Sequence, residues 1–200
     1  MFENKKYKTR SFDEVFDLQL GKTPSRKEFK YWCTNDHKWV SVADMGRYDR
    51  FTSSTSEYIS NEAILDTGIK IVPKGTVIMS FKLTIGRTSI TNEDIYTNEA
   101  IVAFLSKKVE YINNDYLRLY LSTYDWSSGK MNAVKGMTLN STSIGEAALA
   151  IPPKPIQDAF ANFVESCDKL KFKVQQFIKS IFKRRLFAKI FLLIAFSRQL

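Results

Sequence analysis

The C-terminal part of this 200-residue chain carries a regular apolar pattern that constrains how the chain can fold. A proline cluster at 151–155 precedes the pattern and limits where a helix can begin. Apolar residues then recur at alternating steps of four and three, the heptad pattern of a coiled coil. They are Ile156, Phe160, Phe163, Cys167, Leu170, Val174, Phe177 and Ile181. The pattern predicts one long helix, and these eight positions form its predicted dimerisation seam.

Beyond residue 181 the pattern changes its step. Arg184 interrupts the strict count, and four-residue steps continue the stripe through Phe182, Leu186, Ile190 and Ile194, as after a stutter. A helix over 156–194 would be roughly 58 Å long, more than a domain built from about 150 residues can cover. We therefore expect part of the seam to be buried against another helix, and the chain shows no second heptad stretch.

The charge is distributed unevenly along the chain, whose net charge is +9. Residues 1–153 hold 20 Lys and Arg against 18 Asp and Glu, which leaves +2. Residues 154–200 hold 10 against 3, which leaves +7. A solvated helix face explains such a surplus, and so does an acidic partner or the phosphates of a nucleic acid.

Composition and cysteine content indicate an ordinary packed protein of a reducing compartment. Apolar residues make up 44% of the chain and aromatic residues 14%, ample for a core. Cys33 and Cys167 lack a CxxC partner, so we expect neither a disulfide framework nor a zinc site. No signal peptide is visible, and the apolar segment 186–196 contains Lys189 and is about half a bilayer span. We expect a cytoplasmic location and no membrane contact.

The fold class predicted is α+β, with a mixed α/β domain at 1–153 followed by one long coiled-coil helix at 154–200. Ser11 and the acidic residues after it mark a helix start, with an apolar face that runs through Leu20 and an end at Gly21. Short β-branched or alternating runs predict strands at 39–42, 69–72, 76–80, 88–90, 100–105, 137–139 and 147–151. Asn114 and Asp115 begin a further short helix.

The motifs that would indicate catalysis are incomplete. The Gly-Lys-Thr sequence at 21–23 resembles the end of a phosphate-binding loop, but that loop requires glycine where the chain has Phe16. Glu28 and Lys30 lack the metal-binding aspartate of a nuclease site. His37 is the single histidine and has no nucleophile to form a triad. We expect no catalytic residue, metal or cofactor in this chain.

Several short motifs follow one another in an order that is recognisable as a set. They are Gly21-Lys22-Thr23-Pro24-Ser25, Tyr31-Trp32, the segment 39–44, Tyr58-Ile59-Ser60, the segment 73–77, Thr84-Ile85-Gly86-Arg87, and Ile151-Pro152-Pro153 with Ile156-Gln157. Together with the heptads, they resemble a target-recognition domain and conserved helix of the specificity subunit of type I restriction–modification enzymes. The resemblance covers about residues 10–185.

The resemblance implies a subunit that binds double-stranded DNA without catalysis of its own. Type I methyltransferase subunits dock on such a subunit and use S-adenosylmethionine, and an endonuclease subunit is a further expected partner. Members of the family usually carry two recognition domains and two helices that pair within one chain. This sequence has one of each, so we expect a homodimer through the seam.

Three polar segments contain the residue types that bind DNA on loops able to enter a groove. The candidate DNA-binding residues are Lys22, Thr23, Ser25 and Arg26 in a loop stiffened by Pro24, then Ser80, Lys82, Thr84 and Arg87, and finally Lys135, Thr138 and Asn140. Gly86 would allow a close approach of the backbone. The alternative is that Pro24 and Gly86 only shape turns and that the basic residues are solvated surface. Tyr31, Trp32 and Trp39 are expected to be packing aromatics more than base-stacking groups.

Three other interpretations stay open at this stage. The first is that the chain is a truncated or silent fragment kept as recognition-domain sequence. The second is a coiled-coil adaptor with an α/β head and no DNA role, and the third is an unrecognised enzyme. An adenine methyltransferase gene next to this one would favour the specificity subunit over the last two.

Overall fold

The computed structural model describes residues 7–126 and 139–197, with side chains up to residue 182. The chain divides into two compact units, Met1–Asp158 and Ala159–Leu200. This division falls after Asp158, whereas the sequence suggested residue 153. The reason is that the amide of Gln157 donates to the carbonyls of Pro152 at 2.8 Å and Tyr111 at 3.0 Å, which holds the first turn of the long helix to the first unit.

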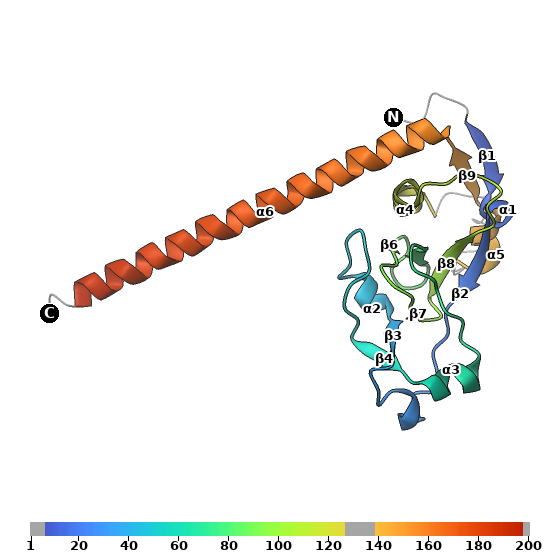
Figure 1. Cartoon of the computed structure of the whole chain (residues 1–200), viewed down its shortest axis with the longest axis horizontal. Coiled ribbons are helices and arrows are strands. Elements are labelled where there is room, and N and C mark those ends of the chain that lie inside the picture. Colours follow the sequence, from blue (N-terminus) through green and yellow to red (C-terminus); the bar gives the residue numbers. More distant parts are fainter. Residues whose placement is uncertain (1–6, 127–138, 198–200) are drawn as a thin grey trace. The chain divides into compact units, whose positions relative to one another are not determined.

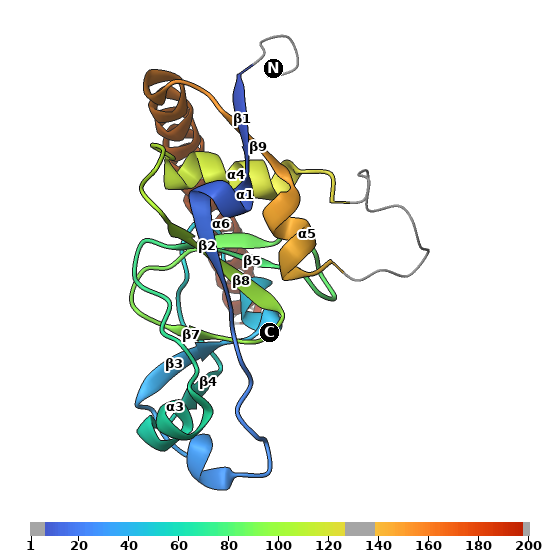
Figure 2. The ribbon, with the colours of Figure 1, turned by 90° about the vertical axis from the view of Figure 1, so that its right-hand side faces the viewer.

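The strands of the described residues form two sheets and one strand pair. They are β1 (Lys8–Ser11), β2 (Phe16–Leu20), β3 (His37–Val40), β4 (Glu57–Ile59), β5 (Val77–Ser80), β6 (Thr88–Ile90), β7 (Tyr96–Thr97), β8 (Ile101–Ser106) and β9 (Ala148–Ile151). The four-stranded sheet has the order β2–β8–β5–β6, the three-stranded sheet has the order β4–β3–β7, and β1 pairs with β9. Only the β3–β7 ladder among these is parallel. Figure 2 shows β3, β4 and α3 together at one end of the first unit.

The helices are short except for the last one. They are α1 (Phe12–Val15), α2 (Val42–Met45), α3 (Asn61–Thr67), α4 (Asn114–Thr123), α5 (Ser141–Glu146) and α6 (Lys154–Ser197), with a 3₁₀ turn at Phe29–Tyr31. The long helix expected over 156–194 is confirmed as α6, a continuous helix in Figure 1. Pro155 fits its first turn because the N–H that proline lacks has no partner there. Within the described ranges, no helix combines the length and hydropathy that a bilayer crossing requires.

The helix predicted from Ser11 to Gly21 is wrong beyond Val15. The chain leaves α1 there and continues as β2, which pairs antiparallel with β8 so that Leu18 lies opposite Phe104. The segment 16–20 alternates apolar and polar residues, a strand pattern that the apolar helical spacing obscured. Pairing with β8 decides that this segment is a strand and not a continuation of the helix.

Two other strand predictions also need correction. Residues 69–72 form no strand and contribute one isolated bridge, between Val72 and Ile95. The strand expected at 39–42 lies at His37–Val40, and Val42 begins α2 instead. The strand expected at 137–139 lies outside the described residues except for Leu139, which is buried. The strands β5, β6, β8 and β9 occur where the sequence predicted them.

The core of the first unit consists of apolar clusters around the sheets. One cluster contains Val40, Met45, Val72, Ile78, Ile95, Ile101 and Ala103, and another contains Tyr31, Trp39, Ile59, Ala63, Ile69 and Tyr96. Phe12 is fully buried, with the rings of Phe104, Tyr120 and Trp126 within 6.3 Å of its own. This packing holds the ends of the strands, and with them the loops that carry the candidate DNA-binding residues.

Candidate nucleic-acid interface

The first candidate loop, residues 22–26, starts where two backbone segments approach closely. Lys22 donates its backbone N–H to the carbonyl of Thr97 at 2.8 Å. A Cβ at Gly21 would overlap the carbonyl oxygens of Thr97 and Asn98. Glycine is therefore required here for space, and this contact sets the position from which the loop leaves.

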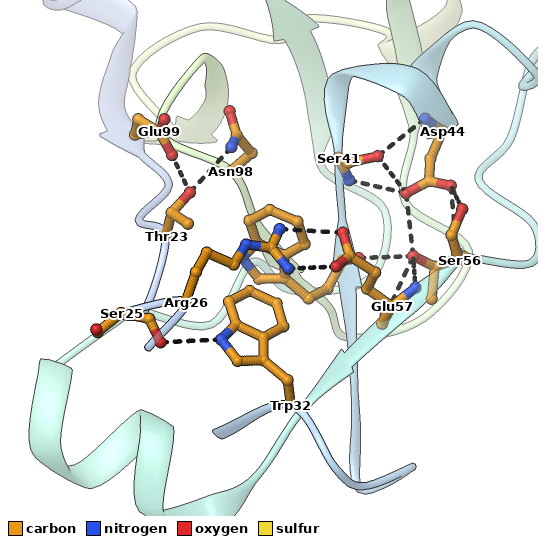
Figure 3. A network of polar contacts seen from close by, with 12 residues as sticks. Thr23, Ser25, Arg26, Trp32, Ser41, Asp44, Ser56, Glu57, Asn98 and Glu99 are labelled. Carbon is orange, nitrogen blue, oxygen red and sulfur yellow. Dashed lines mark hydrogen bonds and ion pairs between the residues drawn. The ribbon is translucent and has the colours of Figure 1, made fainter. Parts of the chain in front are cut away.

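Polar side chains at the start of this loop are turned toward the protein. The ammonium of Lys22 donates to the carbonyl of Thr67. The hydroxyl of Thr23 donates to Glu99 and accepts from the amide of Asn98 at 2.9 Å (Figure 3). Ser25 is exposed. Lys22 is exposed as well, whereas Thr23 is partly buried.

Arg26 is held by an acidic side chain and an aromatic ring. Its guanidinium forms a two-point ion pair with Glu57, and the longer hydrogen bond measures 3.1 Å (Figure 3). The same group lies 3.7 Å from the centre of the Trp32 ring. Trp32 in turn meets the buried Trp39 edge-on, with ring centres 5.0 Å apart. Arg26 thereby ties the loop to β4, and a base contact would require it to leave Glu57.

A buried carboxylate that sequence reasoning missed lies close to this pair. Asp44 in α2 is fully buried. Its oxygens accept from the backbone N–H groups of Ser41 at 2.9 Å and Ser56 at 3.2 Å and from both serine hydroxyls (Figure 3). They also accept from the guanidinium of Arg47. Burial alone would raise the pKa of Asp44, but the hydrogen bonds from Ser41 and Ser56 outweigh it and hold the pKa below its usual value. The Ser-x-x-Asp spacing at 41–44 was the available signal, because it is typical of a capped helix start.

The second candidate segment surrounds the loop between β5 and β6. Ser80 is excluded from the interface because its side chain is fully buried and its hydroxyl donates to the carbonyl of Thr84. The hydroxyl of Thr84 is buried as well. Lys82 and Arg87 are exposed, and neither has a hydrogen-bond or ion-pair partner in the described part of the chain. The loop therefore offers two cations to a ligand.

The backbone conformation at Gly86 explains why glycine occupies this position. Its φ is +84°, in the left-handed region that glycine adopts without steric cost. A Cβ at this position would lie 3.9 Å from the carbonyl oxygens of Leu121 and Ser122, an ordinary contact. Within the protein, glycine is therefore favoured here by its φ, and the expected close approach of this backbone to DNA stays a prediction.

The third candidate segment is described only in part. Lys135 and Thr138 lie outside the described residues. Asn140 caps α5, and its side-chain oxygen accepts the backbone N–H of Ser143 at 2.9 Å. The side chain of Asn140 is thus engaged at a helix start.

Helix α2 connects the first two loops through direct contacts. The guanidinium of Arg87 lies against Gly46, in the space that a Cβ would fill at the end of α2. In the same helix, Asp44 holds Ser56, which precedes the Arg26 partner Glu57 in the sequence. A continuous set of contacts therefore joins Arg87 to Arg26.

Apart from Lys22, which donates to a carbonyl, the described cations of the first unit fall into two groups. Those paired with acidic side chains are Lys8 and Arg10 with Glu110, Arg26 with Glu57, Lys30 with Asp66, Lys38 with Glu93, Arg47 with Asp44, Arg50 and Arg118 with Asp115, Lys107 with Asp17, and Lys154 with Asp158. Those without an ion-pair or hydrogen-bond partner for the side chain, among the residues described, are Lys27, Lys70, Lys74, Lys82, Arg87 and Lys108. A paired cation contributes little net field, so the second group is the charge available to phosphates.

Comparison with known proteins decides the family. A family model described as the type I restriction modification DNA specificity domain matches residues 4–180. The chain belongs to this family. The resemblance seen in the motif order is thereby confirmed. The matched region includes nearly all of the first unit, Met1–Asp158, which is the recognition unit, and much of α6.

Relatives of this specificity domain include named specificity subunits. The chain is 24% identical over 170 residues to the specificity subunit of the type I restriction enzyme MjaIX from Methanocaldococcus jannaschii. The alignment covers 83% of this chain and 39% of that protein.

Two solved structures share the fold of this specificity domain. The HsdS subunit from Thermoanaerobacter tengcongensis superposes with a TM-score of 0.61 at 14% identity, over 85% of this chain and 39% of that one. The S subunit of a type I restriction–modification system from M. genitalium gives a TM-score of 0.55 at 12% identity, over 84% of this chain and 41% of that one. The predicted α+β fold class is confirmed, and the chain spans about 40% of the length of the relatives it matches.

Proposed function

We propose that this chain supplies the DNA sequence recognition of a type I restriction–modification complex and directs methyltransferase subunits to a two-part site. The observation that carries the proposal is the family match, which runs through the recognition unit and on into α6. Lys82 and Arg87, which have no ion-pair partner in the described part of the chain, support it because they offer charge to phosphates. Catalysis and S-adenosylmethionine belong to the methyltransferase in this proposal, and the location is the cytoplasm.

The exposed seam of α6 supports pairing with a second copy of the chain. Along the second unit, the exposed fractions of Phe163, Leu170 and Phe177 are 65%, 63% and 66%. Burying one such side chain contributes roughly 1.5–3 kcal/mol, so an uncovered row of them favours association. The described residues contain one helix of this length, and we therefore propose that the second copy covers the seam.

A broader apolar arc toward the end of α6 supports docking of a methyltransferase subunit. Ile178 and Phe182 are exposed and follow the seam positions Phe177 and Ile181 by one residue each. One residue turns a helix by about 100°, so these side chains widen the apolar face beyond a two-helix seam. The wider face suits a bundle in which a methyltransferase helix lies beside the dimer. The endonuclease subunit is a further proposed partner.

Co-expression with a type I methyltransferase subunit tests the proposal. DNA from cells that carry both genes should contain methylated adenine at one defined motif. Cells with either gene alone should show none. The matched control is a chain with Phe163→Asp and Phe177→Asp, which keeps the recognition unit and disrupts the seam.

One alternative is a silent fragment that is retained as recognition-domain sequence. In this alternative a longer specificity subunit carries the activity; the alignment covers 39% of the MjaIX specificity subunit. In that case co-expression yields no methylated motif, although the purified chain still folds.

A further inference from the structure

The loop between β5 and β6 ends in an apolar side chain that points to solvent. Leu83 is 93% exposed, and its backbone has φ of +65°. That left-handed conformation is disfavoured for a residue with a Cβ, and leucine lacks the short polar side chain that lets asparagine adopt it. An exposed apolar residue on a strained backbone is the kind of arrangement that a folded protein keeps at functional positions.

Backbone hydrogen bonds among residues 80–87 hold the loop, so the position of Leu83 is defined. Ser80 donates its N–H to the carbonyl of Arg87 at 2.9 Å, and Gly86 donates to the carbonyl of Ser80 at 3.0 Å. Thr84 donates to the carbonyl of Lys82 at 2.7 Å, which closes the tip. These hydrogen bonds fix the direction of the leucine before any ligand binds.

The charges around the tip indicate what kind of ligand it meets. Lys82 precedes Leu83 and Arg87 closes the loop, and both are exposed without an ion-pair partner among the described residues. Ile85, between them, is half exposed. An apolar tip between two free cations matches a DNA groove, where phosphates line the rim and the bases present apolar surface inside.

We propose that Leu83 is a base-contacting residue that packs against the bases of double-stranded DNA, while Lys82 and Arg87 contact the flanking phosphates. The proposal rests on the proposed function in DNA recognition and adds the residue that would contribute an apolar contact to sequence preference. Such contacts are made with the methyl group of thymine or with a base step that the side chain partly opens.

The test measures binding of the full chain to two duplexes at several salt concentrations. One duplex is selected by the wild-type chain from a random-sequence library, and the other has the same composition in scrambled order. Leu83→Asn should weaken binding to the selected duplex roughly 10-fold, the effect of losing one buried leucine, and leave the scrambled duplex unaffected. The salt dependence of DNA binding by the Leu83→Asn chain should equal that of the wild type. Lys82→Ala should weaken both duplexes alike and lower the salt slope by about one.

Stability measurements separate a base contact from a structural role. Asparagine and glycine suit a φ of +65°, so Leu83→Asn and Leu83→Gly should leave the melting temperature unchanged or raise it, even as they weaken binding. Leu83→Met should retain binding because it keeps an apolar side chain. Leu65→Asn in α3 is the matched control, since Leu65 is 81% exposed, and it should bind like the wild type.

Two results would overturn the assignment of Leu83. The first is a Leu83→Asn chain that binds the selected duplex as tightly as the wild type. The second is a variant with normal DNA binding that no longer assembles with the methyltransferase subunit, which would make the tip a protein contact. A wild-type chain that selects no duplex from the library would instead refute the proposed function itself.

Discussion

Two arginines of the first unit show how the same side chain serves different purposes. Arg26 is paired with Glu57 and stacked on Trp32, so its charge is neutralised within the fold. Arg87 lies against Gly46 and has no ion-pair partner among the described residues. Both occupy basic loops in the sequence, but only Arg87 presents an uncompensated charge to a phosphate.

Asp44 is the residue whose replacement should most directly reveal the role of the polar network. Asp44→Asn removes the ion pair with Arg47 and weakens the hydrogen bonds from Ser41 and Ser56. Because these groups are partly buried, we expect a loss of about 1–3 kcal/mol in the free energy of unfolding, measured by urea denaturation. Asp36→Asn, at an exposed position, should change it by less than about 0.5 kcal/mol.

The pH dependence of this variant follows from the lowered pKa of Asp44. A carboxyl with a lower pKa in the folded state contributes stability above its unfolded pKa, about 3.9, and this contribution is lost as the pH falls through the folded value. Wild-type stability should therefore decline more steeply below about pH 4 than that of Asp44→Asn. Identical acid profiles would show that the network does not stabilise the charged form.

At the scale of elements, the first candidate loop depends on a close contact between Gly21, just after β2, and the end of β7. Gly21→Ala would place a methyl group on the carbonyl oxygens of Thr97 and Asn98. Because both are backbone atoms, we expect a loss of at least about 2 kcal/mol in the free energy of unfolding.

Gly75 provides the matched comparison for Gly21. Its φ is +78° and a Cβ there would meet nothing within 4 Å, so its requirement is conformational. Gly75→Asn should be tolerated better than Gly75→Ala because asparagine adopts positive φ more readily. At position 21 asparagine should be as harmful as alanine. Equal tolerance of asparagine at both positions would contradict the steric explanation for Gly21.

Also at the scale of elements, the exposed seam of α6 predicts that two copies of the chain associate. Phe163→Asp combined with Phe177→Asp should shift a dimer toward monomer in sedimentation at micromolar concentration, because two charges would enter an apolar interface. Phe172→Asp is the control: Phe172 is also exposed, and nine residues from Phe163 it lies on the opposite face of the helix. A wild-type chain that sediments as a monomer would refute pairing through the seam.

At the scale of the whole molecule, one recognition unit and one long helix impose a symmetry on any dimer. A closed dimer of identical chains has a two-fold axis, so both recognition units present the same surface to DNA. Two identical surfaces select identical half-sites in opposite orientations. The 44 residues of α6 extend about 66 Å, enough to span half-sites roughly 34–36 Å apart on one face of B-DNA.

The methylated motif should therefore be an interrupted palindrome with a fixed gap. Mapping of methylated adenine in cells that carry this chain and its methyltransferase measures it directly. Two different half-sites would show that another specificity chain supplies the second half, and the homodimer would have to be abandoned.

Features that depend on local pattern were predictable from the sequence. The alternating steps of three and four residues after Pro155 specify α6, because each step depends only on the next turn of the same helix. β5 and β8 were predictable as well, since buried runs such as Ile101-Val102-Ala103-Phe104 combine apolar character with strand length. The order of short motifs was sufficient to indicate the family.

Tertiary structure alone decided the features that depend on distant residues. Phe16–Leu20 is a strand because β8, far along the chain, offers the ladder with which it pairs. Arg26 is paired with Glu57, a residue 31 positions away, and Ser80 is buried within its sheet. The physical reason is common to all three: hydrogen bonding and burial depend on which segments meet in space, whereas local pattern records only what each segment prefers by itself.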